Sequence, residues 1–372
     1  MSELAARDVP VWGGGMRRME AEEGAILVPA FVDLCCESGF PGFPAREDAS
    51  SLAAAAVAGG FGHLLLSPRV IPIVDTPEHL SQIPRFLPGG TRAWAAAALT
   101  MGLEGHELSE VGLLKQAGVV ALSDGGIPVR DTVVLRNAME YARAFDIPII
   151  LRPADPDLDA LGVCHESRLS AQIGLRGNPA ANEEIGVARI LALARSTGAR
   201  VHLTHITSTR ALDLITPSSG VTASTPARNL ILDESVLGDG RYDSRYRLHP
   251  PVRSEGDRRA LVSAVAAGSL WLTADHQPRA PEEKEHEFEH AIPGSTGLET
   301  AFAAAMTAIG SLDVVVHALS LGPAAWIGAS GGFALVNPTA EFVVDAGTHK
   351  SRARNDALHG QALRGRVLGF VP

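Results

Sequence analysis

Eight short apolar runs, each followed by a stretch of helical character, restrict the fold of this chain more than any other feature. The runs are continuous rather than alternating in polarity, which is typical of strands buried on both faces of a parallel sheet. Strands that alternate with helices along a chain form parallel sheets covered by helices. Eight such units predict an α/β fold of the (β/α)8 or TIM-barrel type. The predicted strands are residues 26–34, 63–66, 93–99, 119–122, 148–151, 200–205, 220–224 and 270–274.

Helix start signals between the runs favour the same architecture. Ala-rich or amphipathic stretches begin beside Asp, Ser or Thr, whose side chains cap the free N–H groups of a first helical turn. The predicted helices are residues 51–58, 133–145, 182–197, 209–215 and 255–267.

The chain is longer than a plain barrel, and its pattern changes after Gly331. A barrel of this type takes about 250 residues, whereas this chain has 372. Strand-like segments follow at residues 333–337, 341–344 and 362–370. We expect a barrel over residues 26–331 and a small, reduced β appendage built from residues 1–25 and 332–372. The irregular N-terminal segment should supply few strands to it.

The net charge and the cysteine content restrict which partners this chain can bind and which cell compartment it can occupy. The net charge of −10 argues against a surface for nucleic acid or anionic membrane, which requires clustered Lys and Arg. The three cysteines, Cys35, Cys36 and Cys164, are too few for a disulfide framework, and two are adjacent. No signal-peptide pattern opens the chain. We therefore expect a cytoplasmic protein that acts on a small molecule or another protein.

Polar side chains gather directly after the predicted strands. The active sites of α/β barrels lie at the C-terminal ends of their strands, so these positions predict where a site would form. The residues found there are Cys35, Glu37, Asp124, Arg152, His205 and Asp275.

Long phrases from residue 26 to the C-terminus give the chain a strong resemblance to the class I dihydroorotases of the amidohydrolase superfamily. They include FVDL, LSDGGIPV, VHLTHITSTRAL, HPPVRSEGDRRAL, TADHQP and SRARNDALHGQALRGRV. The resemblance implies a distorted α/β barrel that binds one or two zinc ions. In that family the zinc activates water for the reversible ring closure of carbamoyl-aspartate to dihydroorotate.

Followed residue by residue, the resemblance implies that part of the metal site has been replaced. The His-x-His pair that ends the family's first strand corresponds to Cys35 and Glu37. The histidine that ends its fifth strand corresponds to Arg152, whose guanidinium has no lone pair to give a metal.

Other positions of that site retain their residue types. His205 matches the ligand of the sixth strand, and Asp275 matches the metal-binding and proton-transfer carboxylate of the last. Asp124 matches one member of an Asp pair on the fourth strand, with Gly125 beside it. His205, Asp275 and Asp124 are the vestigial catalytic set.

The substrate contacts implied by the resemblance are also changed. The family's carboxylate-binding Arg corresponds to Gly39, and the segment that should offer an Asn carries Arg69 instead. A second Asn corresponds to His249, and the His after the DHxP motif corresponds to Arg279.

Ligand counting then predicts a pseudoenzyme without a metal or other cofactor. Activation of water near neutral pH requires a firmly held metal, typically with three or more protein ligands. We expect a noncatalytic dihydroorotase homologue of pyrimidine biosynthesis. The resemblance implies aspartate carbamoyltransferase as its structural or regulatory partner, and a homodimer is plausible on the same basis.

Two alternatives stay open. One is an active cyclic amidohydrolase with a rewired mononuclear zinc site made by Cys35, Glu37, His205 and Asp275, since all four side chains can bind zinc. The other is a small-molecule sensor with an anion pocket made by Arg69, Arg152 and Arg279.

Arg152 carries a separate structural hypothesis. If no metal is bound, the carboxylates of the site need another source of positive charge, because unpaired buried charges are costly. We expect the Arg152 guanidinium to compensate Glu37, Asp124 and Asp275.

Overall fold

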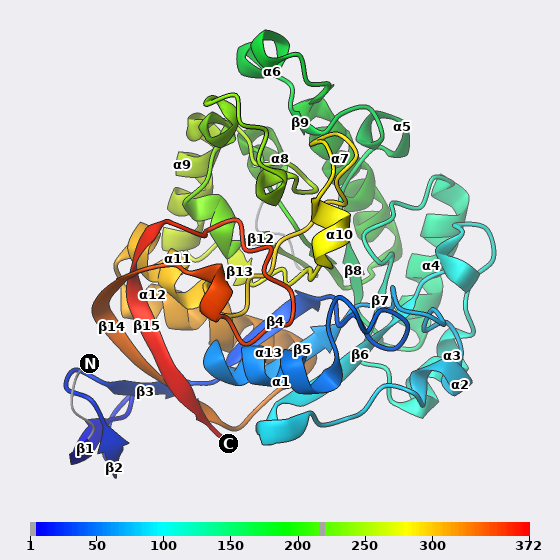
Figure 1. Cartoon of the computed structure of the whole chain (residues 1–372). Helices are drawn as coiled ribbons and strands as arrows, with labels where there is room; N and C mark the ends of the chain where they lie inside the picture. The colour runs from blue at the N-terminus through cyan, green and yellow to red at the C-terminus, as the bar shows by residue number, and fades with distance from the viewer. Residues whose placement is uncertain (1–4, 216–219) are drawn as a thin grey trace.

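The computed structural model describes residues 5–215 and 220–372, and it confirms the predicted α/β barrel (Figure 1). Neighbouring strands of the main sheet pair in parallel. A bridge between Cys36 and His276 joins the first strand to the end of the last. Among the described residues the eight strands are β4 (Phe31–Cys36), β5 (Phe61–Leu66), β6 (Arg92–Ala98), β7 (Ala121–Ser123), β8 (Ile149–Leu151), β11 (Val201–Leu203), β12 (Val221–Pro226) and β13 (Trp271–Thr273).

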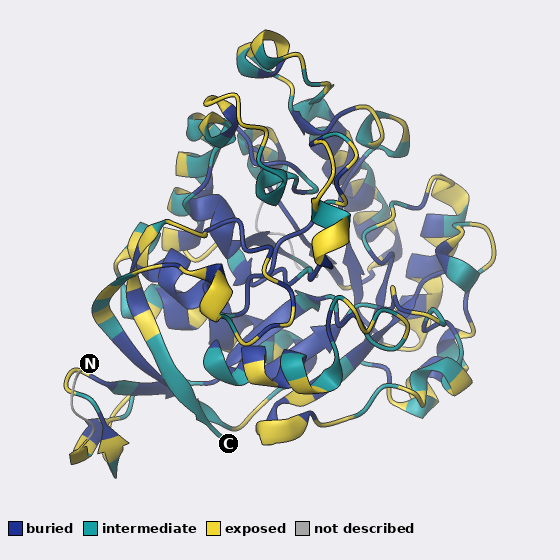
Figure 2. Cartoon of the chain, in the orientation of Figure 1, coloured by how far each residue is buried: buried dark blue, intermediate teal, exposed yellow. Residues whose placement is uncertain are grey.

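Helices surround the barrel and turn their buried faces toward it (Figure 2). The five predicted helices are present as α1, α4, α7, α8 and α9, and side chains of Asp48, Asp131, Ser208 and Ser254 cap four of them. The helices are α1 (Ala49–Ala58), α2 (Pro77–Leu80), α3 (Val111–Ala117), α4 (Thr132–Ala144), α5 (Pro156–Asp159), α6 (Arg168–Ile173), α7 (Ala180–Thr197), α8 (Thr209–Leu214), α9 (Glu255–Ala266), α10 (Pro281–Lys284), α11 (Ala301–Ile309), α12 (Leu312–Val316) and α13 (Gly322–Ile327).

The first predicted strand, residues 26–34, is in fact two strands in two different sheets. Its first part, β3 (Ile26–Pro29), pairs antiparallel with β14 (Phe333–Val343), and the chain enters the barrel only at β4. At the junction the Ala30 N–H donates to the Gly332 carbonyl outside the barrel. An unbroken apolar run cannot reveal this change of sheet, because both parts are buried.

The β appendage consists of β3, β14 and β15 (Ala362–Val371), with β14 in the middle. The two segments expected at residues 333–337 and 341–344 are one strand, interrupted by a bulge in its pairing with β15. The N-terminal segment is more regular than predicted, because β1 (Ala5–Pro10) and β2 (Met16–Ala21) form an antiparallel hairpin that projects from the body (Figure 1). Residues 1–4 lie outside the described residues. A short parallel pair, β9 (Cys164–His165) and β10 (Gly177–Asn178), lies outside the barrel.

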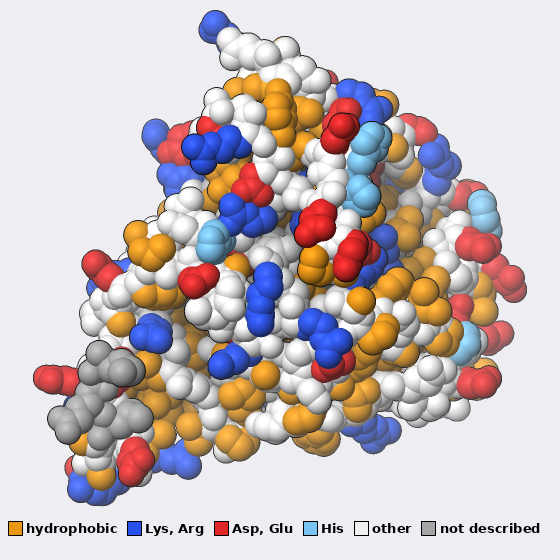
Figure 3. Space-filling model, viewed as in Figure 1, with side chains coloured by type: hydrophobic (Ala, Val, Ile, Leu, Met, Phe, Trp, Pro, Cys, Tyr) orange, Lys and Arg blue, Asp and Glu red, His pale blue; other side chains and the backbone are white. Residues whose placement is uncertain are grey.

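The surface mixes charges of both signs. Basic and acidic side chains are interspersed on the face seen in Figure 3, with apolar side chains between them. No helix in the described part of the chain is long and apolar enough to cross a membrane.

Candidate active site

A cavity lies where the barrel strands end at their C-termini, with a volume of about 720 Å³ when space open to solvent is included. It brings together residues that lie far apart in the sequence, as the barrel prediction required. Of the positions singled out from the sequence, the cavity is lined by Cys35, Glu37, Arg69, Asp124, Arg152, His205, His249, Asp275 and Arg279.

Gly39 does not line this cavity. It has a positive φ of 69°, and a Cβ atom there would lie 2.8 Å from both the Cβ and the carbonyl oxygen of Glu47. At the position of the family's substrate-binding Arg, the backbone conformation and the close packing therefore leave no space for a side chain larger than that of glycine.

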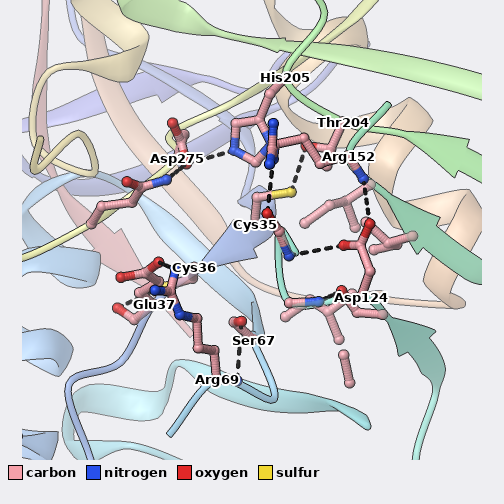
Figure 4. A pocket seen from close by; sticks show the side chains of 18 of the residues that line it. Cys35, Cys36, Glu37, Ser67, Arg69, Asp124, Arg152, Thr204, His205 and Asp275 are labelled. Atoms are coloured by element: carbon pink, nitrogen blue, oxygen red, sulfur yellow. Dashed lines mark hydrogen bonds and ion pairs between the residues drawn. The ribbon is translucent and has the colours of Figure 1, made fainter. Parts of the chain in front are cut away.

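His205 and Asp275 form a direct pair at the cavity wall (Figure 4). Nε2 of His205 lies 2.7 Å from Oδ1 of Asp275, and both residues are buried. Nδ1 of His205 is buried and has no hydrogen-bond partner among the described residues. Both residues have positive φ, 60° for His205 and 46° for Asp275. Such strained backbone in non-glycine residues is concentrated at functional sites.

Arg228 completes this pair and was missed from the sequence. It lies in the 3-10 turn Ala227–Leu230 directly after β12. Its side chain is buried, with Nη2 bonded to Oδ2 of Asp275 and Nη1 3.1 Å from the Asp275 carbonyl oxygen. Burial alone would raise the pKa of Asp275, but the charges and hydrogen bonds of His205 and Arg228 hold it well below its usual range. The position of Arg228 at a strand end was the available signal.

Glu37 is neutralised by a second buried arginine. Oε2 of Glu37 accepts a 2.6 Å hydrogen bond from Nη1 of Arg279, whose Nε donates to the Pro293 carbonyl. Arg69 approaches the other oxygen of Glu37 at 3.9 Å and is half-exposed. The carboxylate of Glu37 is thus already engaged.

Arg152 pairs with a carboxylate that the sequence did not indicate. Its guanidinium donates to both oxygens of Asp159, at 2.9 and 2.5 Å, and its Nε donates to the Gly126 carbonyl. His249 contacts the same carboxylate at 3.1 Å. Although burial opposes it, these hydrogen bonds hold the pKa of Asp159 well below its usual range.

The hypothesis that Arg152 compensates Glu37, Asp124 and Asp275 is therefore wrong for Glu37 and Asp275, which pair with Arg279 and Arg228. Asp124 does feel the positive charge of Arg152, but the guanidinium forms its ion pair with Asp159. Asp124 accepts hydrogen bonds from the backbone N–H groups of Gly126, at 2.8 Å, and Arg152, at 3.1 Å, and burial raises its pKa to about 6. Because Arg152 and Arg279 each hold a carboxylate, they cannot form the free anion pocket required by the sensor alternative.

Cys35 is a protonated thiol in this arrangement. Burial raises its pKa well above the ordinary value, and its Sγ lies 2.8 Å from Oγ1 of Thr204. A cysteine binds zinc as the thiolate, so this environment is unfavourable for a ligand.

The residues present do not fit a zinc ion as they are placed. In residues 5–215 and 220–372, no three His, Cys, Asp or Glu side chains are grouped to hold a metal. Of the four proposed ligands, Glu37 and Asp275 are bonded to arginines and Cys35 is a neutral thiol. A zinc ion would have to displace these partners.

A parallel barrel with a polar cavity at its strand ends defines the class of (β/α)8-barrel proteins, and solved structures share this fold. L-Hydantoinase (dihydropyrimidinase) from Arthrobacter aurescens shares the fold with a TM-score of 0.81 at 16% identity, covering 96% of this chain and 91% of that chain. Dihydropyrimidinase from Brevibacillus agri NCHU1002 has a TM-score of 0.76 at 18% identity, covering 94% and 84%.

Sequence comparisons assign the family. A family model described as dihydro-orotase-like matches residues 24–211. A protein from Solibacter usitatus named dihydroorotase is 36% identical, covering 94% of this chain and 85% of its own length. Another dihydroorotase, from Pelotomaculum thermopropionicum, is 34% identical, covering 92% and 84%. The chain belongs to the dihydroorotase-like family of amidohydrolases.

These relatives overturn the prediction of a noncatalytic pseudoenzyme. Proteins of several species that are named dihydroorotase match almost the whole chain, and hydantoinases share its fold, which indicates an active cyclic amidohydrolase. The prediction relied on ligand counting alone. Counting metal ligands takes no account of pairs such as His205 and Asp275, whereas general acid–base catalysis depends on positioned proton-transfer groups.

Proposed function

We propose that this chain opens, and in reverse closes, the ring of a cyclic amide or ureide related to dihydroorotate, with His205 and Asp275 moving the proton. One observation carries the proposal. His205 lines the cavity and is held at 2.7 Å by the Asp275 carboxylate, while its second ring nitrogen, Nδ1, is buried without a hydrogen-bond partner among the described residues. Membership of a family of cyclic amidohydrolases supports the reaction class.

The pair is suited to general base and acid catalysis. Since Asp275 is ionised, Nε2 of His205 carries a proton toward it, and Nδ1 is left with a lone pair. In the proposed reaction a water molecule enters beside the buried Nδ1, which accepts its proton while the water oxygen bonds to the ring carbonyl carbon. When the ring C–N bond breaks, His205 returns that proton to the leaving nitrogen. Asp275 stabilises the imidazolium that exists between the two transfers.

Arg228 has a positioning role in this scheme. It donates to the Asp275 oxygen that faces away from His205, so it fixes the orientation of the carboxylate as well as its charge. A carboxylate held in this way can turn the imidazole of His205 to one orientation.

The ring that is bound should differ from dihydroorotate in how its acidic group is recognised. The position of the family's carboxylate-binding Arg is Gly39, outside the cavity, and His249 is engaged by Asp159. Another basic side chain must therefore bind an acidic substituent, if the substrate carries one.

Turnover of small rings tests the proposal. The purified chain would be incubated with dihydroorotate, carbamoyl-aspartate, dihydrouracil and hydantoin, with and without added zinc, and ring opening or closure followed by chromatography. We expect at least one ring to react. Replacing His205 by Gln should lower kcat by about 10²-fold or more, the usual contribution of a general base.

The matched control is His317→Gln, which removes an exposed imidazole and should leave kcat unchanged. Absence of turnover with all four compounds, or equal rates for His205→Gln and wild type, would show that the pair does not do this chemistry.

The place of the chain in pyrimidine biosynthesis, its cytoplasmic location, its homodimer and its association with aspartate carbamoyltransferase remain predictions from the resemblance. Co-purification with the carbamoyltransferase of the same cell tests the association.

A further inference from the structure

A second, larger cavity adjoins the candidate active site. Its volume is about 1800 Å³ when space open to solvent is included, and it shares His249 and Pro293 with the lining of the first cavity. The ion pair of Arg152 and Asp159 also spans the two, because Arg152 lines the first cavity and Asp159 the second. The two cavities are therefore neighbours, and a ligand that reaches from His205 into the second cavity has to pass His249.

Arg247 adds a positive charge to this second cavity, where Glu289 attracts it from beyond ion-pair distance. Its Nε is buried without a hydrogen-bond partner, and Nη1 has only long contacts with the carbonyl oxygens of Val163, 3.5 Å, and Leu248, 3.4 Å. In the described part of the chain, no carboxylate lies within ion-pair distance of it. The buried arginines of the first cavity each hold one, as at Arg152 and Arg279.

A partly buried guanidinium without an ion-pair partner favours the binding of an anion. Partial removal of a guanidinium from water costs free energy that hydrogen bonds to a carboxylate or phosphate recover, and the planar fork of Arg suits such groups. The other two arginines of the cavity are already paired at the surface, Arg176 with Glu289 and Arg130 with Asp157.

The wall of the second cavity also offers apolar side chains. Ile127 and Leu161 line it and remain 43% and 51% exposed, and Pro128 lies beside them. Exposed aliphatic side chains inside a cavity favour an apolar ligand segment, because its burial removes their surface from water.

We propose that the second cavity binds a substrate substituent, an aliphatic chain that ends in a carboxylate held by Arg247, while the cyclic amide lies beside His205. This inference rests on the proposed function for the position of the ring. It assigns the acidic group of the substrate to Arg247, a residue distant in sequence from the family's anchor position at Gly39.

Calorimetry with two matched probes tests this. The probes are hydantoins that carry at carbon 5 either an alkyl chain or a chain of equal length that ends in a carboxylate, offered as a series of lengths to the full chain. We expect the best carboxylate probe to bind wild type roughly tenfold or more tightly than its alkyl match, the usual effect of a charge-assisted hydrogen bond. Arg247→Met should abolish the preference, and Arg247→Lys should retain part of it.

Two further arginines serve as controls. Arg176→Gln removes an exposed cation from the same cavity, and Arg69→Gln removes the half-exposed cation of the first. Both should keep the preference. Equal affinity of wild type for the two probes, no binding of either, or loss of the preference in Arg69→Gln would overturn the proposal. The affinities of the wild-type chain for the two probes test the proposal even if an Arg247 variant fails to fold. Binding is measured without turnover, so a clear preference without ring opening would refute only the proposed reaction.

Discussion

Removal of Arg228 is the sharpest test of how the candidate site is held together. Arg228→Met keeps the length of the side chain and deletes the charge that engages Asp275 through two hydrogen bonds. Loss of one partner from a buried ion pair costs about 3–5 kcal/mol, because the remaining charge stays buried. We take the lower part of this range, since His205 still donates to Asp275.

The expected change in melting temperature follows from the size of the chain. The entropy of unfolding is about 2.1 cal/mol/K per residue, which for 372 residues is roughly 0.8 kcal/mol/K. A loss of about 3–4 kcal/mol then lowers Tm by about 4–5 °C, measurable by calorimetry or circular dichroism.

A double-mutant cycle separates this pair from general damage. Replacing Asp275 by Asn removes the charge that Arg228 neutralises, so the double variant should be more stable than the sum of the single changes predicts. Arg245→Met is the matched control, because it breaks the half-exposed pair with Asp243 and should cost less than about 1 kcal/mol. Additive effects at Arg228 and Asp275, or a Tm shift no larger than that of the control, would refute the reasoning.

Three shorter predictions concern pH, backbone and metal. Burial, helped by neighbouring arginines, lowers the pKa of Lys284 from 10.5 to about 7. Between these two pH values the folded chain binds fewer protons than the unfolded chain, so the free energy of unfolding should rise with pH. Lys284→Met should flatten the rise of Tm over the same pH range. Gly39→Ala should lower the free energy of unfolding, measured in urea, by about 1–3 kcal/mol, because its Cβ would lie 2.8 Å from Glu47. The control Gly240→Ala has a similar φ of 70° but open space around its Cβ, and it should lower the free energy of unfolding by less. Zinc added to metal-free wild type should change Tm by less than about 1 °C, since the ligands it needs are engaged; a rise of several degrees would mean that zinc displaces the arginines.

The strand positions and the type of barrel followed from local patterns in the sequence. Continuous apolar runs and capped amphipathic helices depend on residues near one another, so β5 through β13 of the barrel were found within a few residues. The same local logic located His205 and Asp275, because the residue that follows a barrel strand lies at the cavity whichever helices cover it.

The sequence by itself determined the fold, the family resemblance and the positions that line the cavity. Only the tertiary structure decided which charges meet there. Asp275 pairs with Arg228 across 47 residues and Glu37 with Arg279 across 242. Asp159 lies only seven residues from Arg152, but the sequence did not distinguish it from the other acidic residues nearby as the partner of Arg152. Long side chains reach different partners according to how strands and loops pack, and a linear pattern carries no measure of that distance.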